Sequence, residues 1–381
     1  MTPPLTPVRR RRLAIVLNDL GAGGAQRAAL EQAACLDPAV WEVEVVSLEL
    51  KASEGWDTRL PSRIPVRRPG VLGLAAWLRA FAPDLVHAHL ARATIACALA
   101  APFAGHPPIV ATCHNLSDWQ ERRRHPVRVL ARWALHRCAR VIAVSDAVRE
   151  AIATQDPALG RRTVVLRNGA DLSGYRDLSG MRDATRQVLG YRPGTFVVGA
   201  VARLDPRKGL DVLLEAVSEA LHRVPGIEVL IVGDGAERAR LIEQSQTLGL
   251  HTRVRFVGEQ SDVRPYLAAF DLFAAPSRSE GLGIALVEAL AAGVPVAGSR
   301  VGGIPEVLAD GASGWLVEPT VSAWTEALVR AARDSAARAT FAAEGPQRAE
   351  TFSIAGTREA LASIYREVLG EARPCTRAEA A

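Results

Sequence analysis

Residues 195–224 read TFVVGAVARLDPRKGLDVLLEAVSEALHRV, and this stretch contains the unit from which we predict the fold. Its first part, 195–204, is an almost continuously apolar run, which is typical of a strand covered on both faces. Its second part, 209–224, has apolar residues at every third or fourth position, which is typical of an amphipathic helix. A covered strand followed directly by a helix predicts a parallel sheet of the α/β class.

The same alternation of apolar runs and helix-like segments occurs on both sides of one break in the pattern. The break is a passage rich in Gly, Asp and Ser at 168–180. The runs before it are LAIVLND (13–19), VEVVSLE (43–49), LVHAH (85–89), IVATCHN (109–115), RVIAVSD (140–146) and TVVLRNG (163–169). After the quoted stretch the runs are EVLIVGDG (228–235), VRFVGE (254–259), DLFAAPS (271–277) and PVAGSRVGG (295–303). We therefore predict two doubly wound parallel sheets.

The predicted domains are Rossmann-like and cover residues 1–180 and 190–354. An amphipathic helix is expected at 355–372, packed back toward the first domain, and residues 373–381 form a tail. A chain of 381 residues with 49% apolar residues is long enough for two such cores. Ligands of open α/β sheets bind beyond the carboxyl ends of the strands. Two sheets that face each other across a cleft therefore suit a reaction between two substrates.

Cysteine and histidine usage argues against a disulfide framework or a metal site. The five cysteines are an odd number without a CxxC pair, so we expect reduced thiols. His87 and His89 have no third ligand nearby in the sequence, which favours a structural role. The apolar run at 13–17 is too short for an export signal, and 93–105 is shorter than the roughly 20 residues that span a bilayer. We expect a cytoplasmic protein.

Arg203 and Lys208 stand at the end of a predicted strand and in the loop before the next helix. Two cations beside a helix N-terminus suit a diphosphate, because they stabilise its resting charge and the charge that develops if it leaves. A solvated loop with ordinary surface charges is the alternative explanation. Gly21, Gly23 and Gly24 follow the first predicted strand, where backbone N–H groups can approach a phosphate. They lack the full GxGxxG spacing, so they are weak evidence for a dinucleotide.

Glu280 and Glu288 lie eight positions apart in RSEGLGIALVEALAAGVPV, residues 278–296. We predict that Glu280 lies in a turn and Glu288 on the following helix. Eight helical residues rise about 12 Å, which is comparable with the distance from the sugar to the ribose in a nucleotide sugar. The backbone N–H groups of 281–283 would face the part of the nucleotide sugar that lies between its sugar and its ribose. The alternatives are that Glu280 complements a helix dipole and that Glu288 pairs with a surface arginine.

A set of motifs in a fixed order adds to this interpretation. In the second half the set is RLDPRKG (203–209), VGDG (232–235), FVGE (256–259), APSRSEGLGIALVEALAAGVPV (275–296) and GSRVGGIPEVLADGASGWLVEP (298–319). In the first half it is GGAQR (23–27), DLVHAH (84–89), TCHN (112–115), AVSDAVRE (143–150) and VLRNGAD (165–171). The set resembles that of retaining glycosyltransferases of family four, which have the GT-B fold of two facing Rossmann-like domains. The resemblance covers nearly the whole chain.

The resemblance implies roles for individual residues. Arg203 and Lys208 would bind the diphosphate of a nucleotide-sugar donor, and Glu288 would bind its ribose. Glu280 would hold the sugar hydroxyls together with the backbone of Gly281, Leu282 and Gly283. Gly23 and Gly24 would approach the phosphates from the first domain. His114 matches the family's histidine near the transferred sugar; a histidine that satisfies a buried loop is the alternative. Glu306 follows Pro305, and this order is typical of the start of a helix, so complementation of the helix dipole explains Glu306 as well as ligand binding does.

The activity implied is transfer of a hexosyl unit with retention at the anomeric carbon. The departing diphosphate would help to deprotonate the attacking hydroxyl, and the two cations would act on the leaving group. The sequence has no Asp-x-Asp motif, so we expect no metal requirement and no cofactor beyond the co-substrate. UDP-sugars are favoured as donors. The alternatives are GDP-mannose, a non-catalytic partner subunit of the same fold, a sugar-nucleotide epimerase and a dinucleotide-dependent oxidoreductase.

Charge distribution bears on the acceptor. Residues 1–196 contain 27 Lys and Arg against 17 Asp and Glu, whereas the whole chain is only +5. The excess of positive charge in this first half favours a partner that carries negative charge. Residues 119–141 predict a basic amphipathic helix that could lie on an anionic membrane and reach a lipid-linked acceptor; a helix packed on the sheet is the equal alternative. We expect a glycan, polyprenyl-diphosphate-linked or lipid acceptor, no nucleic acid, and a peripheral position on the inner face of the cytoplasmic membrane.

Overall fold

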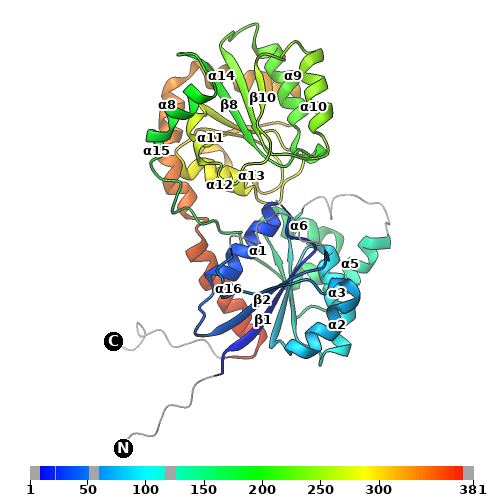
Figure 1. Ribbon diagram of the computed structural model, residues 1–381. Coiled ribbons are helices and arrows are strands. Elements are labelled where there is room, and N and C mark those ends of the chain that lie inside the picture. Colours follow the sequence, from blue (N-terminus) through cyan, green and yellow to red (C-terminus); the bar gives the residue numbers. More distant parts are fainter. Residues whose placement is uncertain (1–8, 22, 51–59, 116–125, 372–381) are drawn as a thin grey trace, which may run out of the picture.

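The computed structural model describes residues 9–21, 23–50, 60–115 and 126–371. Within them the chain forms two α/β domains, one above the other in Figure 1. The first contains a seven-stranded sheet with the order β3-β2-β1-β4-β5-β6-β7, and the second contains a six-stranded sheet with the order β10-β9-β8-β11-β12-β13. Every strand pair in both sheets is parallel. The two predicted doubly wound sheets are confirmed.

The strands of the first sheet are short, and its central strands are mostly buried. They are β1 (Arg11–Leu17), β2 (Trp41–Ser47), β3 (Val66–Arg67), β4 (Leu85–His89), β5 (Ile109–Cys113), β6 (Arg140–Ala143) and β7 (Thr163–Val165). Its helices are α1 (Gly24–Cys35), α2 (Gly70–Phe81), α3 (Ala91–Ala100), α5 (Pro126–His136), α6 (Asp146–Gln155) and α7 (Pro157–Arg162), with a 3-10 turn at Ala101–Phe103. Residues 13–17 of β1 are fully buried, as expected for a central strand with helices on both faces.

The second sheet repeats this construction. Its strands are β8 (Phe196–Val201), β9 (Ile227–Val232), β10 (Val254–Phe256), β11 (Leu272–Ala275), β12 (Val296–Ser299) and β13 (Trp315–Val317). Its helices are α8 (Ser179–Val188), α9 (Leu210–Ala220), α10 (Arg238–Thr247), α11 (Arg264–Ala269), α12 (Ile284–Ala291), α13 (Ile304–Val307), α14 (Val321–Arg333) and α15 (Ser335–Glu350), with 3-10 turns at Pro206–Lys208 and Ala309–Gly311. The unit at 195–224 is β8, one 3-10 turn and α9, so the fold starts from the strand and helix that its pattern predicts.

The chain crosses between the domains twice. After β7 it runs through 166–178 to α8, which packs on α11 of the second domain. After α15 it returns as α16 (Ile354–Val368), which lies beside α1 of the first domain (Figure 1). Leu361 and Tyr365 of α16 are fully buried, and the Tyr365 ring meets Trp41 edge-on with centroids 5.3 Å apart. The last helix thus completes the core of the first domain.

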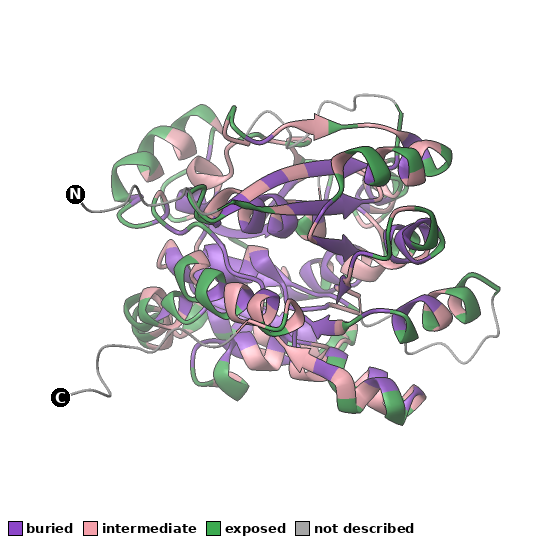
Figure 2. Cartoon of the chain, turned by 90° about the horizontal axis from the view of Figure 1, so that it is seen from below, coloured by how far each residue is buried: buried purple, intermediate pink, exposed green. Residues whose placement is uncertain are grey.

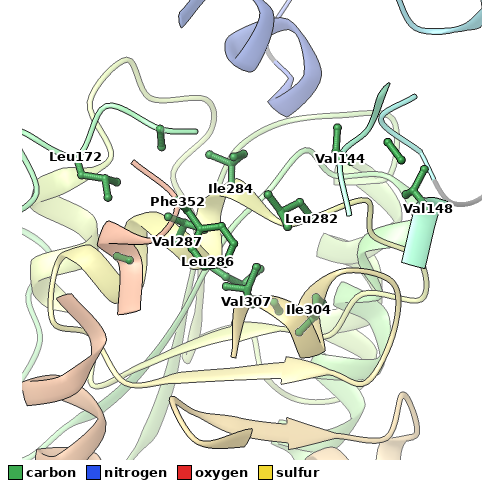
Figure 3. Packing of buried hydrophobic residues seen from close by; sticks show 14 of the residues in the cluster. Val144, Val148, Leu172, Leu282, Ile284, Leu286, Val287, Ile304, Val307 and Phe352 are labelled. Atoms are coloured by element: carbon green, nitrogen blue, oxygen red, sulfur yellow. The ribbon is translucent and has the colours of Figure 1, made fainter. Parts of the chain in front are cut away.

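The apolar core is continuous across the boundary between the domains. Figure 2 shows the buried strands in the interior and exposed helix faces around them. One cluster of buried residues joins Val144 and Val148 of the first domain to Leu282 and Ile304 of the second, and Figure 3 shows these side chains from close by. The two domains therefore meet through packed side chains as well as through polar contacts.

The predicted helix at 119–141 is wrong in its extent. Helix α5 covers only Pro126–His136, and Arg140 is already the first residue of strand β6. The backbone N–H of Ala139 donates to the carbonyl of Ile109 on the neighbouring strand, so the chain enters the sheet there. The buried run after Arg140 pairs as a strand, and that pairing ends the helix. Residues 119–125 lie outside the described residues, as do Cys375 and the tail at 373–381.

Candidate functional site

A cleft of about 1240 Å³ lies between the two domains. From the first domain it is lined by residues that follow β1, β4 and β5, among them Asn18, Leu90 and His114. From the second it is lined by residues that follow β8, β9 and β11, including Arg203 and Asp234. These are the carboxyl ends of the strands, where ligands of doubly wound sheets bind. Ten residues that the sequence analysis assigned to the site line this cleft, namely Gly23, Gly24, His114, Arg203, Lys208, Glu280, Gly281, Leu282, Gly283 and Glu288.

The turn after β8 brings a cation to a carboxylate. Asp205 accepts a hydrogen bond from the backbone N–H of Arg207 (3.0 Å) and so starts the 3-10 turn that carries Lys208. Gly209 follows with φ of +63°, and a Cβ there would lie 2.0 Å from the carbonyl oxygen of Pro276. This close approach of backbones requires glycine. It places the Lys208 ammonium 2.6 Å from Oε2 of Glu280.

Glu280 and Arg203 differ in how firmly the protein holds them. Oε2 of Glu280 also accepts from the hydroxyl of Ser277 at 3.3 Å, and the Glu280 side chain is only 15% exposed. Arg203 pairs with Asp205 at 3.2 Å and is half-exposed. Lys208 and Glu280 therefore form a largely buried pair in the wall of the cleft. Arg203 can turn toward a bound anion, because an exposed pair of this kind contributes little to stability.

The turn from Glu280 into α12 brings the two domains into contact. A Cβ at Gly281 would lie 2.0 Å from the carbonyl oxygen of His114, which belongs to the first domain. Gly283, with φ of +94°, immediately precedes α12, and the side chain of Leu282 is buried in the shared core. The backbone of 281–283 thus lines the cleft at a helix N-terminus, where N–H groups are free to meet a polar ligand.

The two carboxylates of the motif are not joined by eight residues of helix. Helix α12 begins at Ile284, so Glu288 is helical and Glu280 precedes the helix by four residues. The predicted helical rise of about 12 Å between them is therefore wrong, because the glycine-bearing turn replaces half of that helix. Both carboxylates nevertheless line the same cleft.

Glu288 meets two residues that the sequence analysis did not single out. Its Oε1 pairs with the guanidinium of Arg27 on α1, and it accepts a hydrogen bond from the hydroxyl of Tyr175 in the segment between the domains. Arg27 also pairs with Glu31, one turn along the same helix, at 2.7 Å. The sequence analysis gave a surface arginine as the alternative partner of Glu288. Its partner is indeed an arginine, but the Arg27 side chain is only 12% exposed and belongs to the other domain.

His114 belongs to a buried set of hydrogen-bonded side chains. Its Nε2 lies 2.9 Å from Nδ1 of His89, and its Nδ1 lies 3.3 Å from the amide nitrogen of Asn168. His87 contacts the hydroxyls of Thr112 at 2.7 Å and of Tyr365 at 2.6 Å. Burial lowers the pKa of both His87 and His114 to about 3, so both are neutral at pH 7.

His87 and His89 contact other buried side chains. These rings pack on each other with centroids 4.1 Å apart, and His89 bonds His114. Within the described ranges there is no group of three or more His, Cys, Asp or Glu side chains that could hold a metal ion. In this structure both ring nitrogens of His114 are engaged by protein groups, so its predicted catalytic role stays a prediction.

The glycines after β1 lie at the opposite wall of the cleft. Gly23 is the residue before α1, and Gly24 has open space where a side chain would be. Asp19 holds this turn by accepting from the backbone N–H of Gly21 (3.0 Å) and from the amide of Gln26 (2.8 Å). Both Gly23 and Gly24 line the cleft, so their backbone is open to a ligand from the side of the first domain.

Glu306 joins the two domains. Its Oε1 accepts from the backbone N–H of Ala147 at the start of α6 (3.0 Å), and its Oε2 pairs with Arg167 (3.0 Å). Glu306 thus complements the N-terminus of a helix in the other domain rather than that of its own helix α13. It does not line the cleft.

Helix α5 presents apolar side chains to solvent. Val127, Val129 and Leu130 are exposed by 50%, 61% and 39%, whereas Leu135 is buried against the domain. Val127 also lines the cleft. The predicted amphipathic character is therefore present in a shorter helix, and its apolar side is divided between the core and the solvent. In the part of the chain that the structure describes, no helix is both long and apolar enough to span a bilayer.

Comparisons with known proteins agree with this geometry. The model of Glycosyltransferase Family 4 matches residues 22–173, and that of Glycosyl transferases group 1 matches residues 181–348. The D-inositol 3-phosphate glycosyltransferase of Rhodococcus opacus is 40% identical over 215 residues, which are 54% of this chain and 48% of that protein. The match thus spans about half the length of that relative.

Two further proteins are similar over most of the chain. The D-inositol 3-phosphate glycosyltransferase of Saccharomonospora viridis is 32% identical over 347 residues, which are 82% of this chain and 77% of that protein. Among solved structures, the complex of Anabaena HepE with UDP and glucose has a TM-score of 0.82 and 26% identity. That similarity covers 94% of this chain and 100% of the other. The two-domain architecture found here is the GT-B architecture.

Proposed function

Because the chain belongs to the family 4 glycosyltransferases, we propose that it transfers a hexosyl unit from a nucleotide-diphosphate sugar to a hydroxyl of a second substrate held by the first domain. The observation that carries this proposal is the meeting of Lys208, Glu280 and the backbone of 281–283 in the cleft between the domains. A cation, a carboxylate and free N–H groups match a diphosphate joined to a polyhydroxylated sugar.

The donor would lie mainly on the second domain. Lys208 and Arg203 would bind its diphosphate, and Gly23 and Gly24 would approach it from the first domain. Glu280 would accept hydrogen bonds from the sugar hydroxyls, since its contact with Lys208 holds it close to the diphosphate. Glu288 would accept from the ribose hydroxyls. UDP is the favoured nucleotide of the donor, and the UDP and glucose bound in the Anabaena structure support that choice.

Transfer would proceed with retention at the anomeric carbon. The bond from that carbon to the diphosphate breaks, the acceptor oxygen bonds to the same carbon from the same side, and the departing diphosphate takes the acceptor proton. Lys208 and Arg203 would stabilise the negative charge that grows on the leaving group. We propose no metal requirement, because these cations can do the work of a metal at the diphosphate.

The acceptor is proposed to be a glycan or a lipid-linked sugar at a membrane surface. Helix α5 supports this, because its exposed valines and leucine lie next to arginines and reach the edge of the cleft at Val127. A membrane position also fits the basic first half of the sequence. Arg122, Arg123 and Arg124 belong to the predicted basic segment but lie outside the described residues.

The first test is a calorimetric titration with UDP, GDP, ADP, dTDP and NAD, without metal and then with Mg²⁺. Saturable binding of one nucleoside diphosphate without metal supports the proposal and identifies the base; GDP in place of UDP would indicate GDP-mannose. Binding of NAD alone would indicate an oxidoreductase. A protein that binds none of these compounds would be the non-catalytic partner subunit.

The second test separates the sugar role of Glu280 from diphosphate binding. Glu280→Ala should lower transfer at least about 100-fold, because it removes charge-assisted hydrogen bonds to the sugar in the transition state. Affinity for the nucleoside diphosphate should change only a few-fold. The matched control is Glu318→Ala, an exposed carboxylate of the second domain that pairs with Arg300 away from the cleft. Activity of Glu280→Ala within a few-fold of the wild type would overturn the assignment.

The membrane proposal is tested by sedimentation with anionic vesicles. Replacing Arg122, Arg123 and Arg124 by Ser should reduce the bound fraction and its sensitivity to salt. The control replaces Arg223, Arg330 and Arg333, which are exposed on the second domain. Equal sedimentation of the two triple variants would remove the argument for a membrane surface.

A further inference from the structure

Glu288 is held by residues from outside its own domain. It lies on α12 of the second domain, whereas Arg27 lies on α1 of the first and Tyr175 in the segment that joins the two. Arg27 and Tyr175 also lie within 3.5 Å of each other through the guanidinium and the hydroxyl. Three parts of the chain thus converge on one carboxylate, and all three residues line the cleft.

The contact between Glu288 and Arg27 is buried, which strengthens the attraction between their charges. The side chain of Glu288 is 4% exposed and that of Arg27 is 12% exposed. Burial alone would lower the pKa of Arg27, but the nearby carboxylates of Glu288 and Glu31 raise it above its ordinary value. The pKa of Tyr175 is raised, first by burial and then by Glu288. Arg27 is therefore a cation and Tyr175 a neutral hydroxyl donor at neutral pH.

The two contacts use only one oxygen of the carboxylate. The hydroxyl of Tyr175 and the guanidinium of Arg27 both meet Oε1. Within the described residues no hydrogen bond to Oε2 is found, although Glu288 lines the cleft. A carboxylate can accept hydrogen bonds on both oxygens. The second oxygen therefore has capacity for a ligand while the first stays bound.

We propose that Arg27 and Tyr175 are positioning residues that hold Oε1 of Glu288 so that Oε2 receives the ribose hydroxyls of the nucleotide. The inference rests on the proposed function and adds to it two residues and a dependence between the domains. Since Arg27 belongs to the first domain, the ribose site in the second domain is complete only when the domains are in contact. Recognition of the ribose is thus coupled to the closed arrangement of the cleft.

This arrangement makes a specific prediction about ribose selectivity. A ribose hydroxyl that donates to a carboxylate held in place forms a charge-assisted hydrogen bond, and loss of that bond lowers affinity roughly 10- to 100-fold. The 2′-deoxy form of the same nucleotide tests that bond. If Glu288 is no longer held, its carboxylate can turn away, and the preference for ribose over deoxyribose should fall.

The experiment measures the Kd of the full chain for UDP and for 2′-deoxy-UDP by calorimetry, or for whichever nucleoside diphosphate the wild type binds. The wild type should prefer the ribose form at least about 10-fold. Arg27→Ala should reduce the preference to less than about 3-fold, and Tyr175→Phe should reduce it by a smaller factor because it removes only a hydroxyl. Glu288→Gln should abolish most of it.

Two further variants separate positioning from loss of fold. Arg27→Lys keeps the charge but not the forked geometry, so it should recover part of the preference. Arg223→Ala is the matched control, because Arg223 pairs with Glu326 on the surface of the second domain away from the cleft. If Arg27→Ala does not fold, Tyr175→Phe and Arg27→Lys decide the outcome through the same ratio.

Each outcome is informative. An unchanged preference in Arg27→Ala and Tyr175→Phe would overturn the positioning role while leaving the proposed function intact. Tighter binding of the nucleotide by Arg27→Ala would also overturn it, because Arg27 would then compete with the ribose for Glu288. A wild type that binds the nucleotide without preferring ribose would remove the ribose role of Glu288 and the inference with it. A wild type that binds no nucleotide would remove the proposed function itself.

Discussion

Lowering the pH from 7.0 to 5.5 is expected to destabilise the protein through its three buried histidines. His87 and His89 are 0% exposed and His114 is 6% exposed. Nε2 of His89 is buried without a partner among the described residues, so a proton added there would have no acceptor. The tyrosine at the other end of the set, Tyr365, is also fully buried, and burial raises its pKa. Within this set no carboxylate is available to receive an imidazolium.

The magnitude follows from the pKa values. Burial lowers the pKa of His87 and His114 to about 3, and the pKa of His89 lies well below its ordinary value of 6.5. Between these pH values the unfolded chain binds protons that the folded chain does not, so stability falls as the pH falls from about 6.5 toward 3. One pH unit below 6.5 costs about 1.4 kcal/mol for each histidine. At pH 5.5 the three together lower the free energy of unfolding by about 4 kcal/mol.

Other groups with shifted pKa values contribute little in this pH range. Asp156, Asp205 and Asp211 have lowered pKa values, so their contributions are present above 3.8 and are lost only at more acidic pH. Glu31 acts in the opposite direction, since burial raises its pKa and its protonation favours the folded state as the pH falls. The range from pH 7.0 to 5.5 therefore reports mainly on the histidines.

The assay is urea unfolding at pH 7.0 and at pH 5.5, followed by circular dichroism. The variant His89→Gln removes one titrating group and should reduce the loss of stability at pH 5.5 by about 1 kcal/mol relative to the wild type. A matched control is His222→Gln, because His222 is exposed on the second domain. A wild type that loses less than about 1 kcal/mol over this range would refute the assignment of three neutral, buried imidazoles.

Three further predictions concern contacts seen only in the folded molecule. Gly281→Ala places a Cβ 2.0 Å from the carbonyl oxygen of His114, so it should push the domains apart and lower transfer about 100-fold; full activity would show that this approach is not needed. Glu306→Ala removes the acceptor for α6 and the partner of Arg167, and it should lower the free energy of unfolding by about 1 kcal/mol in urea titrations, whereas Glu318→Ala should not. Tyr365→Phe leaves a buried imidazole nitrogen without its 2.6 Å partner and should cost about 1–2 kcal/mol in the same assay; a stability equal to the wild type would mean that the α16 hydroxyl contributes nothing.

Much of the site could be predicted because its residues are close together along the chain. Arg203 and Lys208 stand five positions apart around one strand end, and Glu280 lies with 281–283 in one turn. Local patterns such as these decide which backbone groups and charges occur at the end of a strand. The prediction failed where local patterns compete. The apolar residues at 127–135 continue into the buried strand after Arg140, and periodicity alone did not separate the helix from the strand.

The sequence by itself determined the alternation of covered strands and helices, and with it two doubly wound sheets and the ends of the strands that carry the site. Tertiary structure alone decided which distant residues meet there. Arg27 is 261 positions from Glu288, and His87 is 278 positions from Tyr365. The physical reason is that strands and helices follow from periodicity over a few residues, whereas these pairs depend on how two finished domains and a returning helix pack against each other.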